Sequence, residues 1–173
     1  MFGKALGNGY AITAVIGKDD IMDAAQKTFI SSTFWTERIG PTAALKTLEI
    51  MEREQSWATI TKKGVEIKEI WQKYADKYDL KVKHSGIPAL AGFNFVSKNA
   101  LKYKTFLTQE MLKKGFLASN LCYSCTEHKS FELRLYEKNI DEIFSKISKF
   151  EDGDDIDPML DGPICHGGFK RLN

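Results

Sequence analysis

Residues 2–18 read FGKALGNGYAITAVIGK, a Gly-rich turn that carries a lysine and continues into a short apolar run. Glycine lets other groups approach the backbone closely, and β-branched residues favour extended backbone. The pattern therefore predicts a buried strand over residues 11–16 that steadies the turn and presents the amine of Lys4. Spacing alone favours an ordinary surface lysine at Lys4, because most lysines are exposed.

A second polar stretch, SSTFWTERIGP at residues 31–41, lies between two predicted helices. Pro41 suits the first turn of a helix, and hydroxyl groups and backbone N–H groups at a helix start can hold a phosphate. Ser32 and Thr33 are therefore candidate phosphate ligands. The same residue types are common in turns and N-caps, so the local sequence also fits a purely structural role.

Farther along the chain, apolar residues recur at helical spacing in some stretches and cluster between turn signals in others. This order predicts an α/β (α+β) fold, in which a strand and helices at the edge of one domain precede a smaller domain of mixed sheet and helices. Predicted helices cover 19–26, 42–55, 57–78 and 97–114, a last helix begins with a capping box at Asn139 and Glu142, and predicted strands cover 81–83, 90–96, 116–120 and 131–136.

The composition is that of an ordinary globular chain of 173 residues, with 28% charged residues and a net charge of +2. This balance gives no reason to expect nucleic acid or a membrane surface as a partner, and no apolar run is long enough to span a bilayer. Three cysteines cannot form a closed set of disulfides, which favours a cytoplasmic location. After residue 150 the chain turns acidic and rich in glycine and proline, which predicts an extended tail over 151–173.

Three potential metal ligands, Cys122, Cys125 and His128, follow a C-x2-C-x2-H spacing. A structural zinc site needs four such ligands in tetrahedral geometry, and the chain has only one C-x2-C pair. Free cysteine is also a common buried residue. A zinc module therefore stays open as a lesser alternative, and we predict no metal site.

The segment G-K-x-x-G-x-G-x-x-x-x-A-x-x-G at residues 3–17 resembles the lysine segment of class III pyridoxal-phosphate aminotransferases, the glutamate-1-semialdehyde 2,1-aminomutase branch in particular. The resemblance implies a fold-type I enzyme with pyridoxal 5'-phosphate as cofactor and Lys4 as its Schiff-base lysine. It also implies that Thr33, with Ser32 as a weaker companion, reaches the cofactor phosphate of the neighbouring subunit. Expected substrates are amino acids or amino-aldehyde and keto compounds.

The same resemblance implies a domain order. Residues 1–50 would form the end of the large cofactor-binding domain, residues 57–150 the small C-terminal domain, and residues 151–173 the tail. In the family a long N-terminal portion precedes the lysine and supplies the aspartate at the pyridine ring, the glycine-rich phosphate turn and a stacking aromatic residue. We therefore expect a C-terminal fragment that is inactive, or nearly so, without a homodimer partner or a complementing N-terminal chain.

One departure from the family bears on the reaction. The Gly-Asn-Pro of the aminomutases is replaced here by TERIGP at residues 36–41, which favours an aminotransferase over a strict aminomutase. The competing hypothesis is a non-catalytic α/β interaction domain, or a remnant that self-associates through its exposed apolar face.

Overall fold

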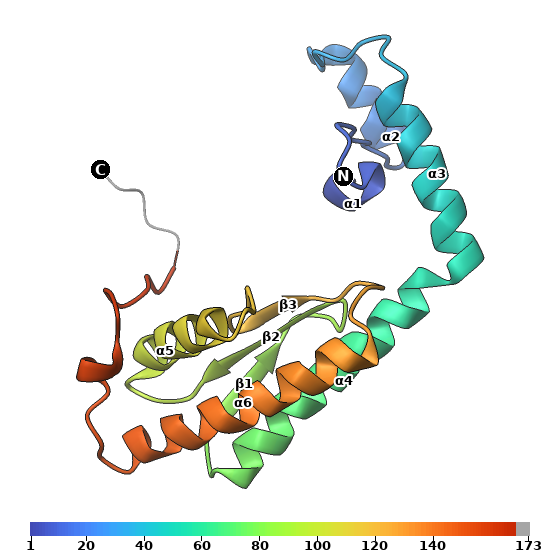
Figure 1. Cartoon of the computed structure of the whole chain (residues 1–173). Coiled ribbons are helices and arrows are strands. Elements are labelled where there is room, and N and C mark those ends of the chain that lie inside the picture. The colour runs from blue at the N-terminus through green and yellow to red at the C-terminus, as the bar shows by residue number, and fades with distance from the viewer. Residues whose placement is uncertain (169–173) are drawn as a thin grey trace. The chain divides into compact units, whose positions relative to one another are not determined.

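The computed structural model describes residues 1–168 and divides into two compact units, Met1–Ser56 and Trp57–Asn173. We call them the N-terminal unit and the C-terminal unit and describe each by itself (Figure 1). The last part of the predicted tail, residues 169–173, lies outside the described residues.

The N-terminal unit consists of helices joined by long irregular segments. Of the strand predicted over residues 11–16, only one bridge forms, between Phe2 and Ala14, with N···O distances of 2.7 and 2.9 Å. A strand needs a neighbour for its backbone N–H and C=O groups, and the described part of this unit supplies only Phe2. The elements are α1 (Lys4–Gly7), α2 (Asp19–Met22), the 3-10 helix η1 (Asp23–Lys27) and α3 (Ile39–Glu54).

The side chains of the N-terminal unit remain largely exposed. Its buried residues are small, namely Gly7, Gly40 and Ala44. Phe29 is 94% exposed and Trp35 is 78% exposed. Within residues 1–56, therefore, no hydrophobic core forms around a large side chain.

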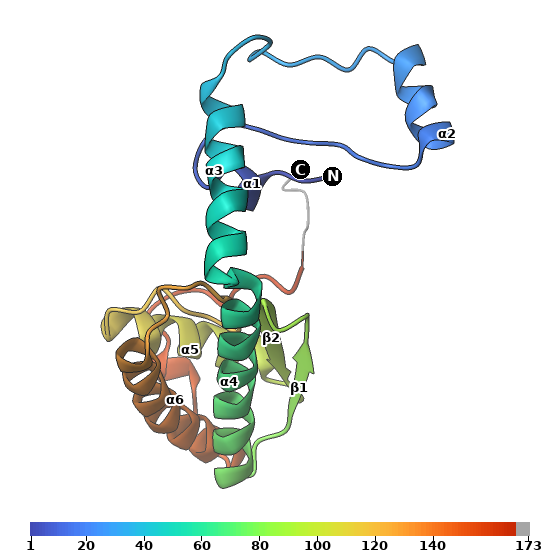
Figure 2. The same cartoon turned by 90° about the vertical axis from the view of Figure 1, so that its right-hand side faces the viewer.

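The C-terminal unit is a three-stranded antiparallel sheet with three long helices. Figure 2 shows the helices gathered on one side of the sheet. The strand order is β1-β2-β3, with Val82 opposite Phe95 and Ala91 opposite Cys122. The strands are β1 (Val82–Ser85), β2 (Leu90–Phe95) and β3 (Leu121–Tyr123), and the helices are α4 (Ser56–Lys77), α5 (Ala100–Lys113) and α6 (Ser130–Glu151).

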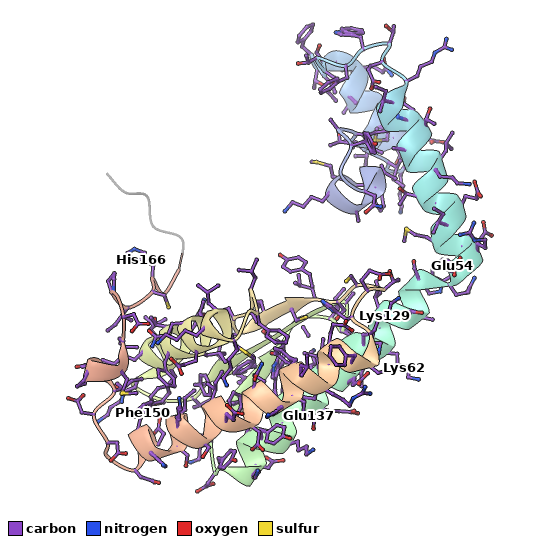
Figure 3. All side chains as sticks on the ribbon, viewed as in Figure 1. Glu54, Lys62, Lys129, Glu137, Phe150 and His166 are labelled. Carbon is purple, nitrogen blue, oxygen red and sulfur yellow. The ribbon has the colours of Figure 1, made fainter. Side chains whose placement is uncertain are left out.

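Aromatic side chains dominate the core between the sheet and the helices. Trp71 of α4 lies tilted against Phe93 of β2 at 4.7 Å between ring centroids, and its indole Nε1 donates a 2.7 Å hydrogen bond to the Tyr136 hydroxyl of α6. Phe150 of α6, labelled in Figure 3, packs edge-on against another ring: the Phe106 ring of α5 lies 5.2 Å away between centroids. Since Trp71, Phe93 and Phe106 have no exposed surface, the three helices and the sheet share one core.

Two predicted strands are wrong. Residues 116–120 run in irregular backbone ahead of β3, and residues 131–136 belong to α6. The buried positions Leu133, Tyr136 and Ile140 are three and four residues apart, so one helix buries them all. For the same reason Asn139 lies inside α6 and caps no helix.

The tail after α6 has irregular backbone for most of its described length, and hydrogen bonds attach it to α5. The short 3-10 helix η2 (Asp157–Met159) interrupts it. The Gln109 side chain donates to the carbonyl oxygen of Met159 at 2.6 Å and accepts from the backbone N–H of Asp161 at 3.0 Å. Ile156 is 4% exposed and joins the core, so side-chain and backbone contacts hold this segment to the unit.

Candidate functional site

Lys4 begins α1, a single helical turn followed by a left-handed residue. Asn8 has φ 48°, and Gly9 after it has φ 105°, a conformation that favours glycine. The bridge between Phe2 and Ala14 fixes the backbone on the N-terminal side of this turn. Lys4 therefore lies in a short helical turn without the buried strand that was predicted behind it, and the lysine side chain is exposed.

Hydrogen bonds from backbone N–H groups to the side chains of Ser32 and Glu37 hold the loop before α3. The Ser32 hydroxyl oxygen accepts a 3.1 Å hydrogen bond from the backbone N–H of Phe34. The Glu37 carboxylate accepts hydrogen bonds from the backbone N–H groups of Ile39 and Gly40, two of the unpaired donors at the start of α3. The sequence did not reveal this role of Glu37, because the residues that usually cap a helix start are Ser, Thr, Asp, Asn and Gly.

A close approach at Gly40 brings the start of α3 against the segment that follows Lys4. A Cβ atom placed on Gly40 would lie 2.5 Å from the carbonyl oxygen of Ala11 and 3.3 Å from the Ile12 Cβ atom. Only a residue without a side chain fits there. The segment that follows the Lys4 turn therefore packs against the first turn of α3, close to the end of the loop that carries Ser32.

Between these two segments is a hollow of about 920 Å³. Lys4 and Ser32, which the sequence analysis selected, both line it, and Thr33 does not. Further lining residues are Tyr10, Ser31, Trp35 and Glu37.

The side chains of this hollow suit a phosphorylated aromatic aldehyde such as pyridoxal phosphate. An amine can react with the aldehyde, hydroxyl groups can donate to phosphate oxygens, and aromatic rings can lie against a pyridine ring. The hydrogen bond that the Ser32 oxygen accepts from Phe34 uses a lone pair, and the hydroxyl hydrogen can still donate to a phosphate oxygen. The residues present therefore fit the cofactor.

The possible zinc ligands of the C-terminal unit do not converge. Cys122 is half-buried in β3, where burial raises the pKa of its thiol, while Cys125 is exposed. His128 Nδ1 faces the backbone N–H of Cys125 at 3.4 Å. Among residues 1–168 no three histidine, cysteine or acidic side chains are arranged to hold a metal ion.

None of the helices within the described residues is long and apolar enough to cross a membrane.

The chain was compared with protein families and with known relatives. The family model "Aminotransferase class-III" matches residues 1–149. The 3-aminobutyryl-CoA aminotransferase of Cloacimonas acidaminovorans (strain Evry) is 32% identical over 154 residues, which cover 86% of this chain and 37% of that protein. The aminopentol aminotransferase of Sphingopyxis macrogoltabida is 28% identical over 85 residues, 49% of this chain and 20% of that protein. The chain thus spans well under half the length of these relatives.

Solved structures show the same fold. The FumI protein of Sphingopyxis sp. MTA144, solved in its pyridoxal-phosphate internal aldimine form, aligns with a TM-score of 0.77 at 21% identity, over 91% of this chain and 39% of that one. A transaminase from directed evolution by ancestral reconstruction aligns with a TM-score of 0.63 at 18% identity, over 86% of this chain and 37% of that one. The predicted α/β fold of a fold-type I transferase is confirmed. With the family model covering most of its length, the chain belongs to the class III aminotransferases, whose cofactor is pyridoxal phosphate.

Proposed function

We propose that this chain takes part in pyridoxal-phosphate-dependent amino-group transfer, with Lys4 as the cofactor-binding lysine. The observation that carries the proposal is the hollow that brings the Lys4 amine and the Ser32 hydroxyl together. When bound, the pyridoxal ring supplies an electron sink for negative charge that develops at the substrate carbon. Lys4 holds the cofactor aldehyde and, once free, moves the proton at that carbon.

The hydroxyl residues have different positions and so different proposed roles. Ser32 lines the hollow of its own chain and can donate to a phosphate oxygen there. Thr33 is exposed and does not line that hollow, which agrees with a role toward the cofactor phosphate of a neighbouring subunit. The role of Thr33 is the one that the family resemblance implies, whereas the role of Ser32 toward its own chain rests on its place in the hollow and differs from the one that the resemblance implies.

Aminotransferase activity is better supported than the aminomutase-like alternative. The two relatives described above are named as aminotransferases, and TERIGP at residues 36–41 departs from the Gly-Asn-Pro of the aminomutases. We propose an amino acid or another amine as donor and a keto or aldehyde compound as acceptor.

We also propose that activity needs a second chain, either a homodimer partner or a chain that complements this one. The support for this proposal is that side chains of the candidate site are open to solvent. Phe34 and Trp35, beside Ser32, are 52% and 78% exposed, and Lys4 is exposed as well. A site that stabilises charge must exclude water, and these side chains do not do so alone. The purified 173-residue chain should therefore show little or no turnover; ordinary transaminase rates from it would refute this part.

The test of Lys4 is covalent labelling. Pyridoxal phosphate is added to the purified chain, the adduct is reduced with borohydride, and the modified lysine is identified by peptide mass spectrometry. We expect saturable labelling of Lys4 at one equivalent, loss of that label in Lys4→Arg, and full labelling in Lys18→Arg, an exposed lysine of the same unit. Label scattered over surface lysines would favour the non-catalytic interaction domain instead.

A further inference from the structure

The C-terminal unit has a hollow of its own, with a volume of about 590 Å³. It lies where the segment before β3, β3 itself and the first turns of α6 meet, with one residue of α4 at its base. The walls are mainly hydrocarbon, and lysine and arginine are absent from the lining that the structure describes. The apolar side chains of the lining are Ile67, Phe116, Leu117, Ala118, Leu121 and Leu133.

One polar group in this lining is buried and has a free hydrogen. Tyr136 is 9% exposed, and its hydroxyl oxygen accepts the 2.7 Å hydrogen bond from Trp71 Nε1. The indole N–H is a donor only, so the Tyr136 O–H hydrogen is not used in that bond. Within residues 1–168, the Tyr136 hydroxyl donates its hydrogen to no acceptor. Burial raises the pKa of the phenol far above its ordinary value of 10.0, so the hydroxyl stays a donor at any physiological pH.

The other polar residues of the lining are Cys122, Tyr123, His128 and Glu132. Glu132 places a carboxylate in the lining, which disfavours an anion. Burial also raises the pKa of the Cys122 thiol, which therefore stays uncharged beside Tyr136. An uncharged molecule can cover the apolar walls with its hydrocarbon body, and a single acceptor on it can pair with the free hydrogen of Tyr136.

We propose that this hollow is a binding site for an uncharged, largely apolar carbonyl compound, whose oxygen accepts the free hydrogen of the Tyr136 hydroxyl. Because Trp71 fixes the phenolic oxygen from within the core, the donor is positioned before the ligand arrives, which lowers the cost of ordering it. The site belongs to the C-terminal unit alone, so it does not depend on Lys4 or on the bound cofactor.

The experiment uses two fluorinated probes of nearly equal size that differ in the carbonyl oxygen. The full chain is titrated with 4'-fluoroacetophenone and with 1-ethyl-4-fluorobenzene, and binding is followed by ¹⁹F NMR. We expect the ketone to bind about three- to tenfold more tightly than the hydrocarbon, the range for one neutral hydrogen bond. In Tyr136→Phe the ketone should lose that advantage, while the affinity of the hydrocarbon stays the same.

Two further variants keep the test decisive. Tyr103→Phe removes the hydroxyl of another buried tyrosine that does not line the hollow, and should leave both affinities unchanged. Ala118→Phe fills the hollow and should abolish the binding of both probes, even if Tyr136→Phe folds poorly. Equal affinity of the two probes for the natural chain, or binding that survives Ala118→Phe, would overturn the proposal. So would a stable dimer that Ala118→Phe dissociates, because the occupant would then be a second copy.

Discussion

The two units of this chain differ in what they bury. The C-terminal unit encloses Trp71, Phe93 and Phe144 without any exposed surface, whereas the N-terminal unit buries only two glycines and an alanine. Burying one large apolar side chain stabilises the folded state by about 1.5–3 kcal/mol. The C-terminal unit therefore buries enough apolar side chains to fold by itself. The unit with the candidate catalytic lysine has almost no such contribution. The proposed chemistry thus belongs to the part of the chain that buries the least surface of its own.

The largest expected effect comes from a matched pair of tryptophans. Trp71→Ala removes a fully buried ring that contacts Phe93 and donates to Tyr136, and should lower the free energy of unfolding by about 3–5 kcal/mol. Trp35→Ala removes a ring that is 78% exposed in the N-terminal unit, and should change it by less than about 0.5 kcal/mol. Urea denaturation followed by far-UV circular dichroism measures both. A similar loss of unfolding free energy in the two variants would mean that Trp35, too, is buried in a core.

The next largest change in unfolding free energy is expected from one of two matched glycine substitutions, one in each unit. A Cβ atom on Gly64 of α4 would overlap the carbonyl oxygen of Pro88 in the turn before β2, so Gly64→Ala should cost about 1–3 kcal/mol of unfolding free energy. Gly40→Ala meets the carbonyl oxygen of Ala11 in the other unit and should leave that free energy nearly unchanged. Its effect should instead be weaker borohydride-trapped labelling of Lys4, because the loop and the turn can no longer approach. Unimpaired labelling in Gly40→Ala would show that this approach does not position Lys4.

The same contrast explains what the sequence could and could not predict. The faces of α4 and α5 could be predicted because their apolar residues recur every three or four positions and meet one core. The start of α6 could not, since FELRLY alternates apolar and polar residues like a strand, and only Leu133, Tyr136 and Ile140 together reveal the helix. The strand over residues 11–16 was predicted from β-branched residues, but pairing depends on a neighbour that the described unit lacks.

The candidate site was predictable only in part, for a related reason. Lys4 and Ser32 could be selected as reactive residue types in glycine-rich and helix-start contexts, and they do line one hollow. That Gly40 brings the two segments together could not be predicted, because the approach depends on a contact across 29 positions of sequence, from Ala11 to Gly40. Nor does any local pattern distinguish Ser32, which lines the hollow, from its neighbour Thr33, which does not.

The smallest expected change in unfolding free energy concerns Glu110 of α5, which we compare with Glu49 of α3. Burial raises the pKa of Glu110, but hydrogen bonds from Lys113 at 3.0 Å and Lys146 at 3.1 Å outweigh it, so the pKa lies below the ordinary 4.5. Since the folded-state pKa is the lower one, this stabilisation is complete above pH 4.5 and is lost as the pH falls through the folded-state value. Glu110→Gln should therefore cost about 1–2 kcal/mol at pH 7, and the difference from the natural chain should shrink toward pH 3.

The control for Glu110 lies in the N-terminal unit. A hydrogen bond from Lys46 lowers the pKa of Glu49 as well, yet both side chains are more than half exposed, so solvent screens the pair. Glu49→Gln should leave the free energy of unfolding unchanged at every pH, as measured by urea titrations between pH 3 and pH 7. A loss equal to that of Glu110→Gln would mean that Glu49 is shielded in the protein by surfaces outside its own unit. The residues around Glu49 would then belong to a surface that is covered in the protein in solution.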